Sequence, residues 1–189
     1  MTAGKRFIWT DIETTGLHAR KDLILALGII ITDENMKELA RAEWVAHYNK
    51  HDLSYALNGN DFVTAMHTKN GLLERVAASK LELCDVEELA SLFIDSYIGQ
   101  PQDSVKDRPS MAGNSVSFDR EFIREDMPLL IERYNYRLLD VSSFKVLAMA
   151  TIPGAAEWNA ARGEAAHTPL KDLEGSISEL AHWVRELRR

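Results

Sequence analysis

An apolar strand that ends in two acidic residues constrains the fold of this chain more than any other feature. Residues 7–10 are apolar or β-branched, Asp11 and Glu13 follow, and Gly16 marks a turn. Side chains at positions i and i+2 of a strand point to the same face, with Cα atoms about 6.5 Å apart. Asp11 and Glu13 can therefore converge where a buried strand leaves the core.

Two carboxylates held together beside an apolar sheet repel each other and lose hydration, so the arrangement is costly without a partner. A divalent cation between them removes both costs, and hard oxygen ligands suit Mg²⁺ or Mn²⁺. The same two acids can also lie harmlessly on a solvated strand end. The stretch by itself leaves a metal site and a solvated end as equal alternatives.

The order of the other apolar runs predicts an α/β fold with one mixed sheet and helices packed on it. Residues 23–32 are almost continuously apolar, which is typical of a strand buried on both faces. Residues 39–48 alternate loosely, as expected for a strand nearer an edge. With the first strand they predict an antiparallel meander. Two short strands, at 110–114 and 137–141, each lead into a helix.

Helix signals are clearest in the second half of the chain. Asp85 and Glu88 predict a capping box that begins a helix ending at Gly99. The last helix is predicted from an N-cap, a proline at the first position and an apolar stripe: Thr168, Pro169, Leu170, Leu173, Ile177, Leu180, Val184 and Leu187. Residues 50–68 have no clear assignment, and the Ala- and Gly-rich segment 151–166 is expected to be mobile.

Length and charge limit the classes of protein that the chain can belong to. Its 189 residues fit one domain, taken as residues 1–189. A net charge of −7 argues against coating long duplex through counterion release, although cations bound at a site can still meet a phosphate. No stretch approaches the ~20 apolar residues of a membrane span, and Cys84 is the single cysteine. We expect a cytoplasmic protein without a membrane partner.

Three more residues complete a candidate catalytic set. Asp119 falls in the first turn of a predicted helix, Asp172 falls one turn into the last helix, and His167 precedes that helix. Two cations ~3.5–4 Å apart can bind the attacking and leaving oxygens of a phosphodiester. A neutral histidine with a pKa near ~6.5 can take the proton of the attacking water. Alone, Asp119 would be a helix-start acid and His167 a surface histidine, so the catalytic interpretation depends on the whole set.

The order and spacing of these residues resemble the DEDDh family of 3′→5′ exonucleases, which includes the proofreading subunits of DNA polymerases. Three motifs carry the resemblance: Asp11-x-Glu13, an Asn-x-x-x-Phe-Asp run ending at Asp119, and His167-x-x-x-x-Asp172. The resemblance implies an RNase-H-like fold with a five-stranded sheet flanked by helices and two Mg²⁺ or Mn²⁺ ions. By this resemblance the four acids would be metal ligands and His167 the general base.

Further motifs look like the oligoribonuclease branch of that family. They are Thr15-Gly16-Leu17, His67-Thr68 with Gly71-Leu72, Gly113-Asn114-Ser115, and Tyr136-Arg137 ahead of Leu139-Asp140-Val141-Ser142. The resemblance implies a homodimer that degrades short single-stranded RNA or DNA oligonucleotides to 5′-mononucleotides. Leu17 and Phe62 would pack on the terminal bases, where stacking is sequence-tolerant. Ser115 would hold phosphate, and Tyr136 with Arg137 would close the 5′ end of the substrate across the dimer.

Several positions depart from the oligoribonuclease pattern. Thr14 stands where those enzymes usually have methionine, Phe62 where they generally have tryptophan, and Ala26 where they usually have an acid. The Ser-Phe-Asp run that ends at Asp119 is nearer the general exonuclease pattern. These differences leave the chemistry intact and keep open a proofreading-type exonuclease with broader DNA and RNA specificity.

Two classes outside this family fit the pattern less well. A phosphatase of the haloacid-dehalogenase kind also begins with an apolar strand ending in acids, but its chemistry needs Asp-x-Asp. Glu13 is one methylene too long for that role, and the pairing of His167 with Asp172 would have no purpose. A nonenzymatic nucleic-acid binding module would gain nothing from retaining four acids and a histidine.

Overall fold

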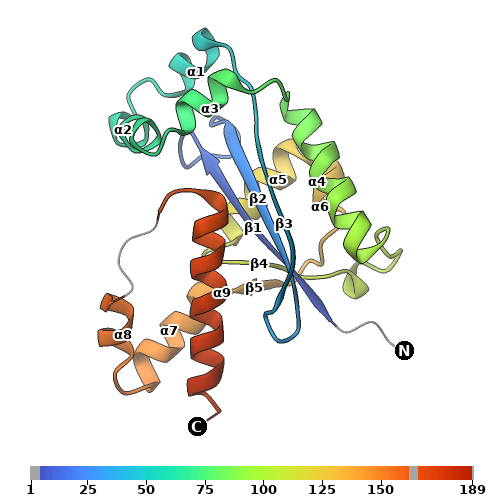
Figure 1. The fold of residues 1–189 in the computed structure, drawn as a ribbon, viewed down its shortest axis with the longest axis vertical. Helices are drawn as coiled ribbons and strands as arrows, with labels where there is room; N and C mark the ends of the chain where they lie inside the picture. The colour runs from blue at the N-terminus through green and yellow to red at the C-terminus, as the bar shows by residue number, and fades with distance from the viewer. Residues whose placement is uncertain (1–4, 162–165, 189) are drawn as a thin grey trace.

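A mixed five-stranded sheet lies at the centre of the protein (Figure 1). The computed structural model describes residues 5–161 and 166–188. The strand order is β3-β2-β1-β4-β5, with bounds β1 Arg6–Thr14, β2 Ile24–Asp33, β3 Glu38–Val45, β4 Met111–Gly113 and β5 Leu138–Asp140. The first three strands pair antiparallel, whereas β4 runs parallel to both β1 and β5. The predicted meander followed by parallel strands is confirmed.

Helices pack on both sides of the strands (Figure 1). Their bounds are α1 Lys50–Ala56, α2 Asp61–Lys69, α3 Leu72–Ala78, α4 Leu83–Ile98, α5 Ser117–Asp126, α6 Pro128–Ile131, α7 Val141–Thr151, α8 Ala155–Ala161 and α9 Pro169–Glu186, with a 3-10 turn, η1, at Val105–Asp107. Helices α4, α5 and α6 lie on one side of the sheet, and α7 and α9 lie on the other. Within the described ranges, no helix has both the length and the apolar character needed to cross a bilayer.

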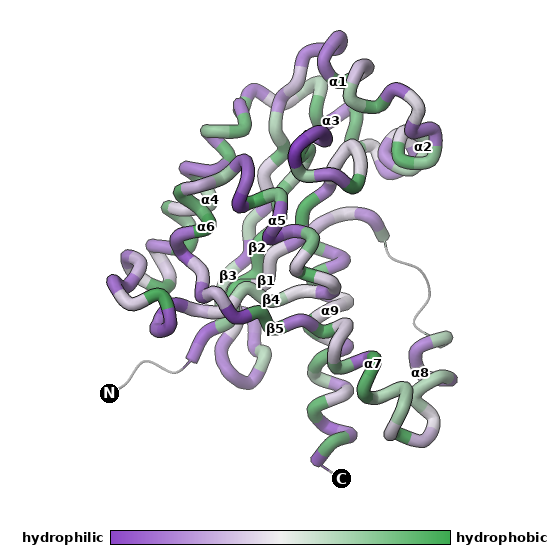
Figure 2. The backbone as a smooth tube through the Cα atoms, turned by 180° about the vertical axis from the view of Figure 1, so that it is seen from behind, coloured by the Kyte–Doolittle hydropathy of each residue, from purple (hydrophilic) through white to green (hydrophobic). Residues whose placement is uncertain are grey.

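The two faces of β1 belong to different cores. Ile8 and Ile12 pack with α4 and α5, whereas Trp9 packs with α7 and α9. Because side chains alternate along a strand, Asp11 and Glu13 share the face of Trp9. Figure 2 shows hydrophobic residues running through the central strands, so the acids extend from an apolar frame. The strand therefore directs both carboxylates toward the helix that carries Asp172.

Helix α9 begins in direct contact with the sheet. A Cβ on Gly28 of β2 would stand 2.5 Å from the Cβ of Pro169, closer than side chains can approach. Gly28 is also the strand partner of Asp11. The missing side chain lets the first turn of α9 descend onto β2, which brings Asp172 beside Asp11.

Two details of the helix predictions need correction. Helix α4 begins three residues earlier than predicted: its capping box is formed by Glu82 and Asp85, and the Asp85 carboxylate accepts a hydrogen bond from the Glu82 N–H at 2.8 Å. Asp85 is thus the returning acid and not the N-cap, while Gly99 is the C-cap as expected. Part of the segment expected to be mobile forms α8, and residues 162–165 lie outside the described ranges.

Candidate active site

Three carboxylates from two elements meet on the α9 side of the sheet. Asp11 and Glu13 extend from β1 and Asp172 from the first turn of α9, and one oxygen of each lies within 4.8 Å of the others. Asp119 begins α5 and is not part of that group of three. Its Oδ1 accepts a hydrogen bond at 2.9 Å from the N–H of Ile12, the residue between Asp11 and Glu13. This bond holds the Asp119 side chain against β1.

Burial and mutual repulsion favour protonation of these acids. Glu13 is 7% exposed, and burial, followed by the charges of Asp172 and Asp119, raises its pKa to about 8. Burial likewise raises the pKa of Asp119 to about 7, although the Ile12 N–H opposes the shift. For Asp11, burial and then the charges of Asp119, Glu13 and Asp172 raise the pKa well above its ordinary value.

The free-energy cost of burying these charges together indicates which kind of ligand the cluster can bind. Carboxylate oxygens are hard ligands, and a divalent cation would replace the protons that the cluster otherwise needs. The acidic cluster therefore fits a metal site with Asp11, Glu13 and Asp172 as its nearest donors. Asp119, on α5, is hydrogen-bonded to the backbone of the strand that carries Asp11 and Glu13.

His167 lies on the backbone that enters α9, in the left-handed region with φ of +53°. Its side chain is exposed, and its carbonyl oxygen accepts a hydrogen bond from Nδ2 of Asn70, which follows α2. The neighbouring Ala166 N–H donates to Oδ1 of Asp172 at 2.8 Å. The segment that carries His167 is thus tied both to α2 and to the acidic cluster.

His67 is part of the site, although the sequence singled it out only as a motif residue. It is fully buried in α2, with Nε2 3.0 Å from the Thr14 carbonyl oxygen and 3.9 Å from Oε2 of Glu13. Burial, and then the charge of His167, lowers the pKa of His67. The buried imidazole therefore lies beside Glu13, and a single-sequence pattern has no signal for the contact of His67 with Thr14, 53 positions away.

The remaining predicted residues fall into two groups. Leu17 and Phe62 are 76% and 74% exposed, and the Asn60 side chain donates to the Thr15 carbonyl oxygen, which ties their two segments together. Two exposed apolar side chains on segments joined in this way suit base stacking. Tyr136 and Arg137 instead contact each other, with the guanidinium carbon 4.9 Å from the ring centroid.

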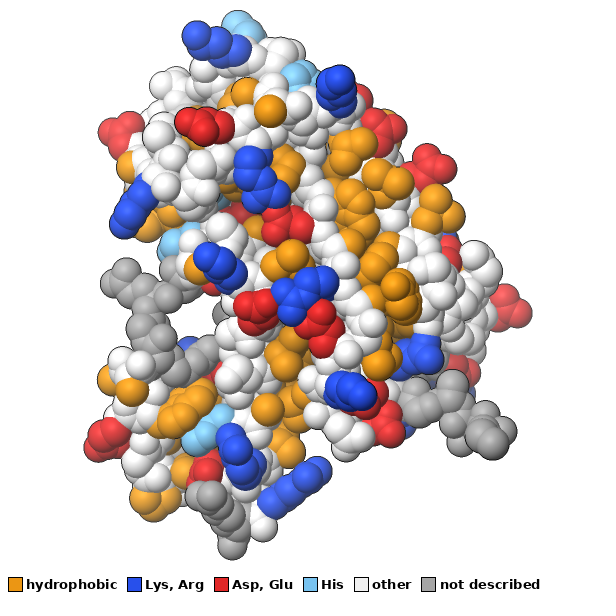
Figure 3. Space-filling view, viewed as in Figure 1, with side chains coloured by type: hydrophobic (Ala, Val, Ile, Leu, Met, Phe, Trp, Pro, Cys, Tyr) orange, Lys and Arg blue, Asp and Glu red, His pale blue; other side chains and the backbone are white. Residues whose placement is uncertain are grey.

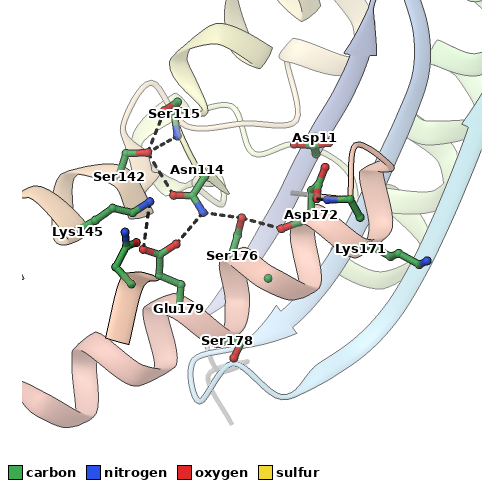
Figure 4. A pocket seen from close by; sticks show the side chains of 13 residues that line it. Asp11, Asn114, Ser115, Ser142, Lys145, Lys171, Asp172, Ser176, Ser178 and Glu179 are labelled. Carbon is green, nitrogen blue, oxygen red and sulfur yellow. Dashed lines mark hydrogen bonds and ion pairs between the residues drawn. The ribbon is translucent and has the colours of Figure 1, made fainter. Parts of the chain in front are cut away.

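A polar cleft of about 760 Å³ opens from the acidic cluster along α9 (Figure 4). Asp11 and Asp172 line one end, and Ser115 lines it further on, whereas Tyr136 and Arg137 do not line it. The Ser115 N–H donates to Oδ1 of Asp140 at 3.0 Å and to Oγ of Ser142 at 2.8 Å, which holds its backbone at a φ of +51°. Volumes of this order suit ligands of nucleotide size.

The fold and this acidic site define a member of a known nuclease family. The RNase_T model, described as an exonuclease, matches residues 8–180, and the chain belongs to this exonuclease family. That membership excludes the phosphatase and the noncatalytic binding module as descriptions of the chain.

Within the family, the chain is similar to oligoribonucleases. It is 35% identical to the oligoribonuclease of Corynebacterium glutamicum over 181 residues, which cover 95% of this chain and 78% of that protein. Identity to the oligoribonuclease of Halorhodospira halophila is 34% over 182 residues, covering 96% and 94% of the two chains. The enzyme from Coxiella burnetii is 34% identical over 180 residues, covering 95% and 93%.

Solved structures of exonuclease I share the fold. The enzyme of Methylocaldum szegediense superposes with a TM-score of 0.64 at 17% identity over 96% of this chain. The zinc-bound complex of E. coli exonuclease I with single-stranded DNA gives 0.60 at 16% identity over 98%. The chain spans only 40% and 42% of the length of those two proteins. The predicted architecture is thus confirmed.

The raised pKa values predict how stability depends on pH without a divalent cation. Between the ordinary pKa of Glu13, 4.5, and its folded value of about 8, the folded chain binds protons that the unfolded chain has lost. The free energy of unfolding in EDTA should therefore fall as pH rises through this window. Asp119 should contribute to the fall up to about pH 7, its own folded pKa. Thermal unfolding measured from about pH 5 to pH 8.5 checks the direction.

Two controls accompany this measurement. Glu13→Gln, which cannot ionise, should show a shallower fall than the unchanged protein. Added Mg²⁺ should prevent the loss of unfolding free energy at high pH. A cation replaces the bound protons, and its affinity for the carboxylates increases as the protons dissociate. Stability that rises with pH in EDTA would contradict the account of the cluster.

Proposed function

We propose that this chain is a metal-dependent 3′→5′ exonuclease that degrades short oligonucleotides, first of all oligoribonucleotides, to 5′-mononucleotides. The observation that carries the proposal is the convergence of Asp11, Glu13 and Asp172 within 4.8 Å, at the mouth of a polar cleft. The names of the relatives support an oligoribonucleotide substrate. The match over residues 8–180 supports a single exonuclease domain across residues 1–189.

In the proposed mechanism the four acids, Asp11, Glu13, Asp119 and Asp172, hold two Mg²⁺ or Mn²⁺ ions. Such ions supply the charge that stabilises the attacking and leaving oxygens of the phosphodiester. Asp11 and Glu13 are fixed by the central strand, and Asp119 is oriented by its hydrogen bond from Ile12. The positions of the donors therefore do not depend on flexible loops.

His167 is the proposed general base. It is exposed at the entrance to α9, and its segment is held by the hydrogen bonds of Ala166 to Asp172 and of Asn70 to the His167 carbonyl. An exposed imidazole beside the acidic cluster can take a proton from the attacking water. Asp172 thus couples the base to the metal-binding acids.

The proposed substrate contacts use both sides of the cluster. Phe62 stacks on the terminal base, because an aromatic face under a base contributes ~1–3 kcal/mol without reading its sequence. Leu17 packs on the terminal bases as a second apolar contact. Ser115 holds phosphate where it lines the cleft. On the face seen in Figure 3, acidic and basic side chains are interspersed and form no continuous basic track, which agrees with short substrates.

A second candidate is a proofreading-type exonuclease with broader DNA and RNA specificity. Ala26 is the strand partner of Glu13, so a small apolar residue lies beside the acidic cluster where oligoribonucleases usually have an acid. Thr14 donates its hydroxyl to the Gly16 carbonyl oxygen at 2.6 Å and fixes the turn that leads to Leu17. Both differences lie where the terminal nucleotide would be bound.

A length series separates the two candidates. RNA and DNA oligomers of two to about ten nucleotides, labelled at the 5′ end, are incubated with Mg²⁺, and initial rates are compared. An oligoribonuclease should cleave RNA of two to five residues fastest and shorten it from the 3′ end, and EDTA should abolish the reaction. Equal rates on long DNA would favour the proofreading type, and full activity in EDTA would contradict metal-dependent hydrolysis.

Removal of the proposed base should slow the reaction without loss of metal. His167→Ala is expected to lower kcat about 10²- to 10⁴-fold, because the proton of the attacking water then has no positioned acceptor. Titration of Mg²⁺ or Mn²⁺ by calorimetry should remain within about threefold of the unchanged protein. His51→Ala, an exposed histidine on α1, is the matched control. An equal loss of metal binding would assign His167 to a ligand role.

We also propose a homodimer in which Tyr136 and Arg137 close the 5′ end of a substrate bound by the other chain. Neither residue lines the cleft of its own chain, which agrees with a role across an interface. Helix α7 exposes a group of apolar side chains, Val146, Leu147 and Met149, and includes hydrophobic stretches at the edge of the molecule in Figure 2. Such a patch marks an interaction surface.

The dimer is tested by its mass in solution. Light scattering should give twice the chain mass of 21.3 kDa for the unchanged protein and a single-chain mass for Val146→Glu. Val146 is 72% exposed, so the substitution should leave the fold of each chain intact. A single-chain mass for the unchanged protein at assay concentration would remove the proposal.

A further inference from the structure

An apolar strip lies on the side of the sheet opposite the acidic cluster, where α4 runs beside β3 (Figure 3). Its members on α4 recur at spacings of three and four, and three of them are exposed although they are apolar: Leu89 by 39%, Leu92 by 55% and Tyr97 by 43%. Together with Phe93 of α4 and Trp44 of β3 they form what we call the α4 strip. The reaction proposed above uses none of these residues.

The α4 strip is held in a fixed position. The ring of Phe93 lies between two aromatic neighbours, with its centroid 5.7 Å from that of Trp44 and 5.2 Å from that of Tyr97. On its inner side α4 packs into the core through side chains that are at most 1% exposed: Val86, Ala90 and Ile94. The helix therefore cannot turn the strip inward without unpacking that core. An apolar patch that stays exposed in this way marks an interaction surface.

The edge strand beside α4 leaves room for a partner. In the described part of the chain, β3 is the last strand on its side of the sheet. Ala40 and Ala42 share the face of Trp44, because side chains alternate along a strand, and both are partly exposed. Two such small residues form a low surface next to the helix. A second helix, about 10–12 Å across with its side chains, can lie there against α4.

The surroundings of the α4 strip are acidic. Helix α4 contains four acidic residues and no Lys or Arg. Among the ion pairs of the described residues, only one of these acids is paired with a base, Asp95 with Arg133 at 2.9 Å. Glu88 is exposed next to Leu89, and Glu82 is exposed at the N-cap. Figure 3 shows acidic side chains along the outer margin of the strip. Lys and Arg next to the apolar residues of a partner would therefore favour its binding.

We propose that the α4 strip is a docking surface for an amphipathic helix of a partner protein, one with an apolar face flanked by Lys and Arg. The apolar face packs on Leu89, Leu92 and Phe93, and the basic residues face the acids around them. The polar cleft lies on the side of α7 and α9, whereas the strip lies on the side of α4. A partner can therefore hold the protein while the acidic cluster stays accessible.

Two other occupants fit the α4 strip less well. A second copy of the chain would bring two acidic surfaces together, which costs free energy. An extended strand could add to the outer edge of β3, but Arg41 of that strand forms ion pairs with Glu38 and Glu174. Charged side chains on an edge strand oppose the addition of another strand. The acidic, apolar face of α4 thus favours a basic helix.

Two designed peptides of 16 residues, the length of α4, test the proposal. Both have Leu at helix positions i, i+3, i+4 and i+7, and the remaining positions are Lys in one peptide and Glu in the other. Fluorescence anisotropy of the labelled peptides gives their affinities for the unchanged protein. The Lys peptide should bind at least about 10-fold more tightly than the Glu peptide, and added salt should weaken its binding. Circular dichroism should show that the Lys peptide gains helix when it binds.

Substitutions locate the binding on the α4 strip. Leu92→Gln should weaken binding of the Lys peptide about 5- to 20-fold, because the exposed half of this leucine would be buried in the complex. Leu187→Gln is the matched control: Leu187 is 52% exposed at the C-terminal end of α9, and this variant should bind as the unchanged protein does. Glu88→Lys should weaken binding of the Lys peptide and strengthen binding of the Glu peptide. Thermal unfolding confirms that each variant is folded.

Several outcomes would overturn the proposal. They are absence of binding, equal affinity for the two peptides, and equal affinity of Leu92→Gln and Leu187→Gln for the Lys peptide. A bound Lys peptide that gains β-structure instead of helix would assign the occupant to the edge of β3. If Leu92→Gln, unlike Leu187→Gln, halves the mass given by light scattering, the strip joins two copies of the chain. None of these measurements uses catalysis, so the result does not depend on the proposed exonuclease activity.

Discussion

The mutual repulsion of buried carboxylates is the constraint on which the rest of this structure depends. Asp11 and Glu13 cannot leave the central strand, because its two faces, which carry Trp9 and Ile12, are anchored in two different cores. The sheet thus holds the charges together at the expense of stability, and the fold tolerates this only while protons or cations compensate. Burial of the apolar side chains around the strand stabilises the fold enough to offset the cost of the buried charges.

Features that depend on nearby residues could be predicted from the sequence. The apolar run of β2 and the stripe of α9 have local periods, and four acids at element ends are visible as motifs. The start of α4 was misplaced because Glu82 and Asp85 have the same capping chemistry as the pair three residues later. Ambiguity of this kind is local, and only packing resolves it.

Features that join distant segments could not be predicted. His67 reaches Glu13 from a region that showed no clear pattern, and Glu179 appeared only as a polar residue between the apolar positions of a helix. Both residues contact partners more than 30 positions away; those of Glu179 include Asn114 and Lys145. A buried polar residue is tolerated only where hydrogen-bond partners satisfy it, and a single sequence does not show which residues those partners are.

The contact between Gly28 and Pro169 links the docking of α9 to any cation that the acidic cluster binds. Because the helix lies directly on β2, the backbone of Asp172 stays beside the cluster as long as the first turn is seated on the sheet. Each cation that binds the seated helix stabilises that seating, and every change that loosens the seating weakens the cations by the same free energy. A change in the packing of α9 on the sheet is therefore also a change in the affinity of the acidic cluster for cations.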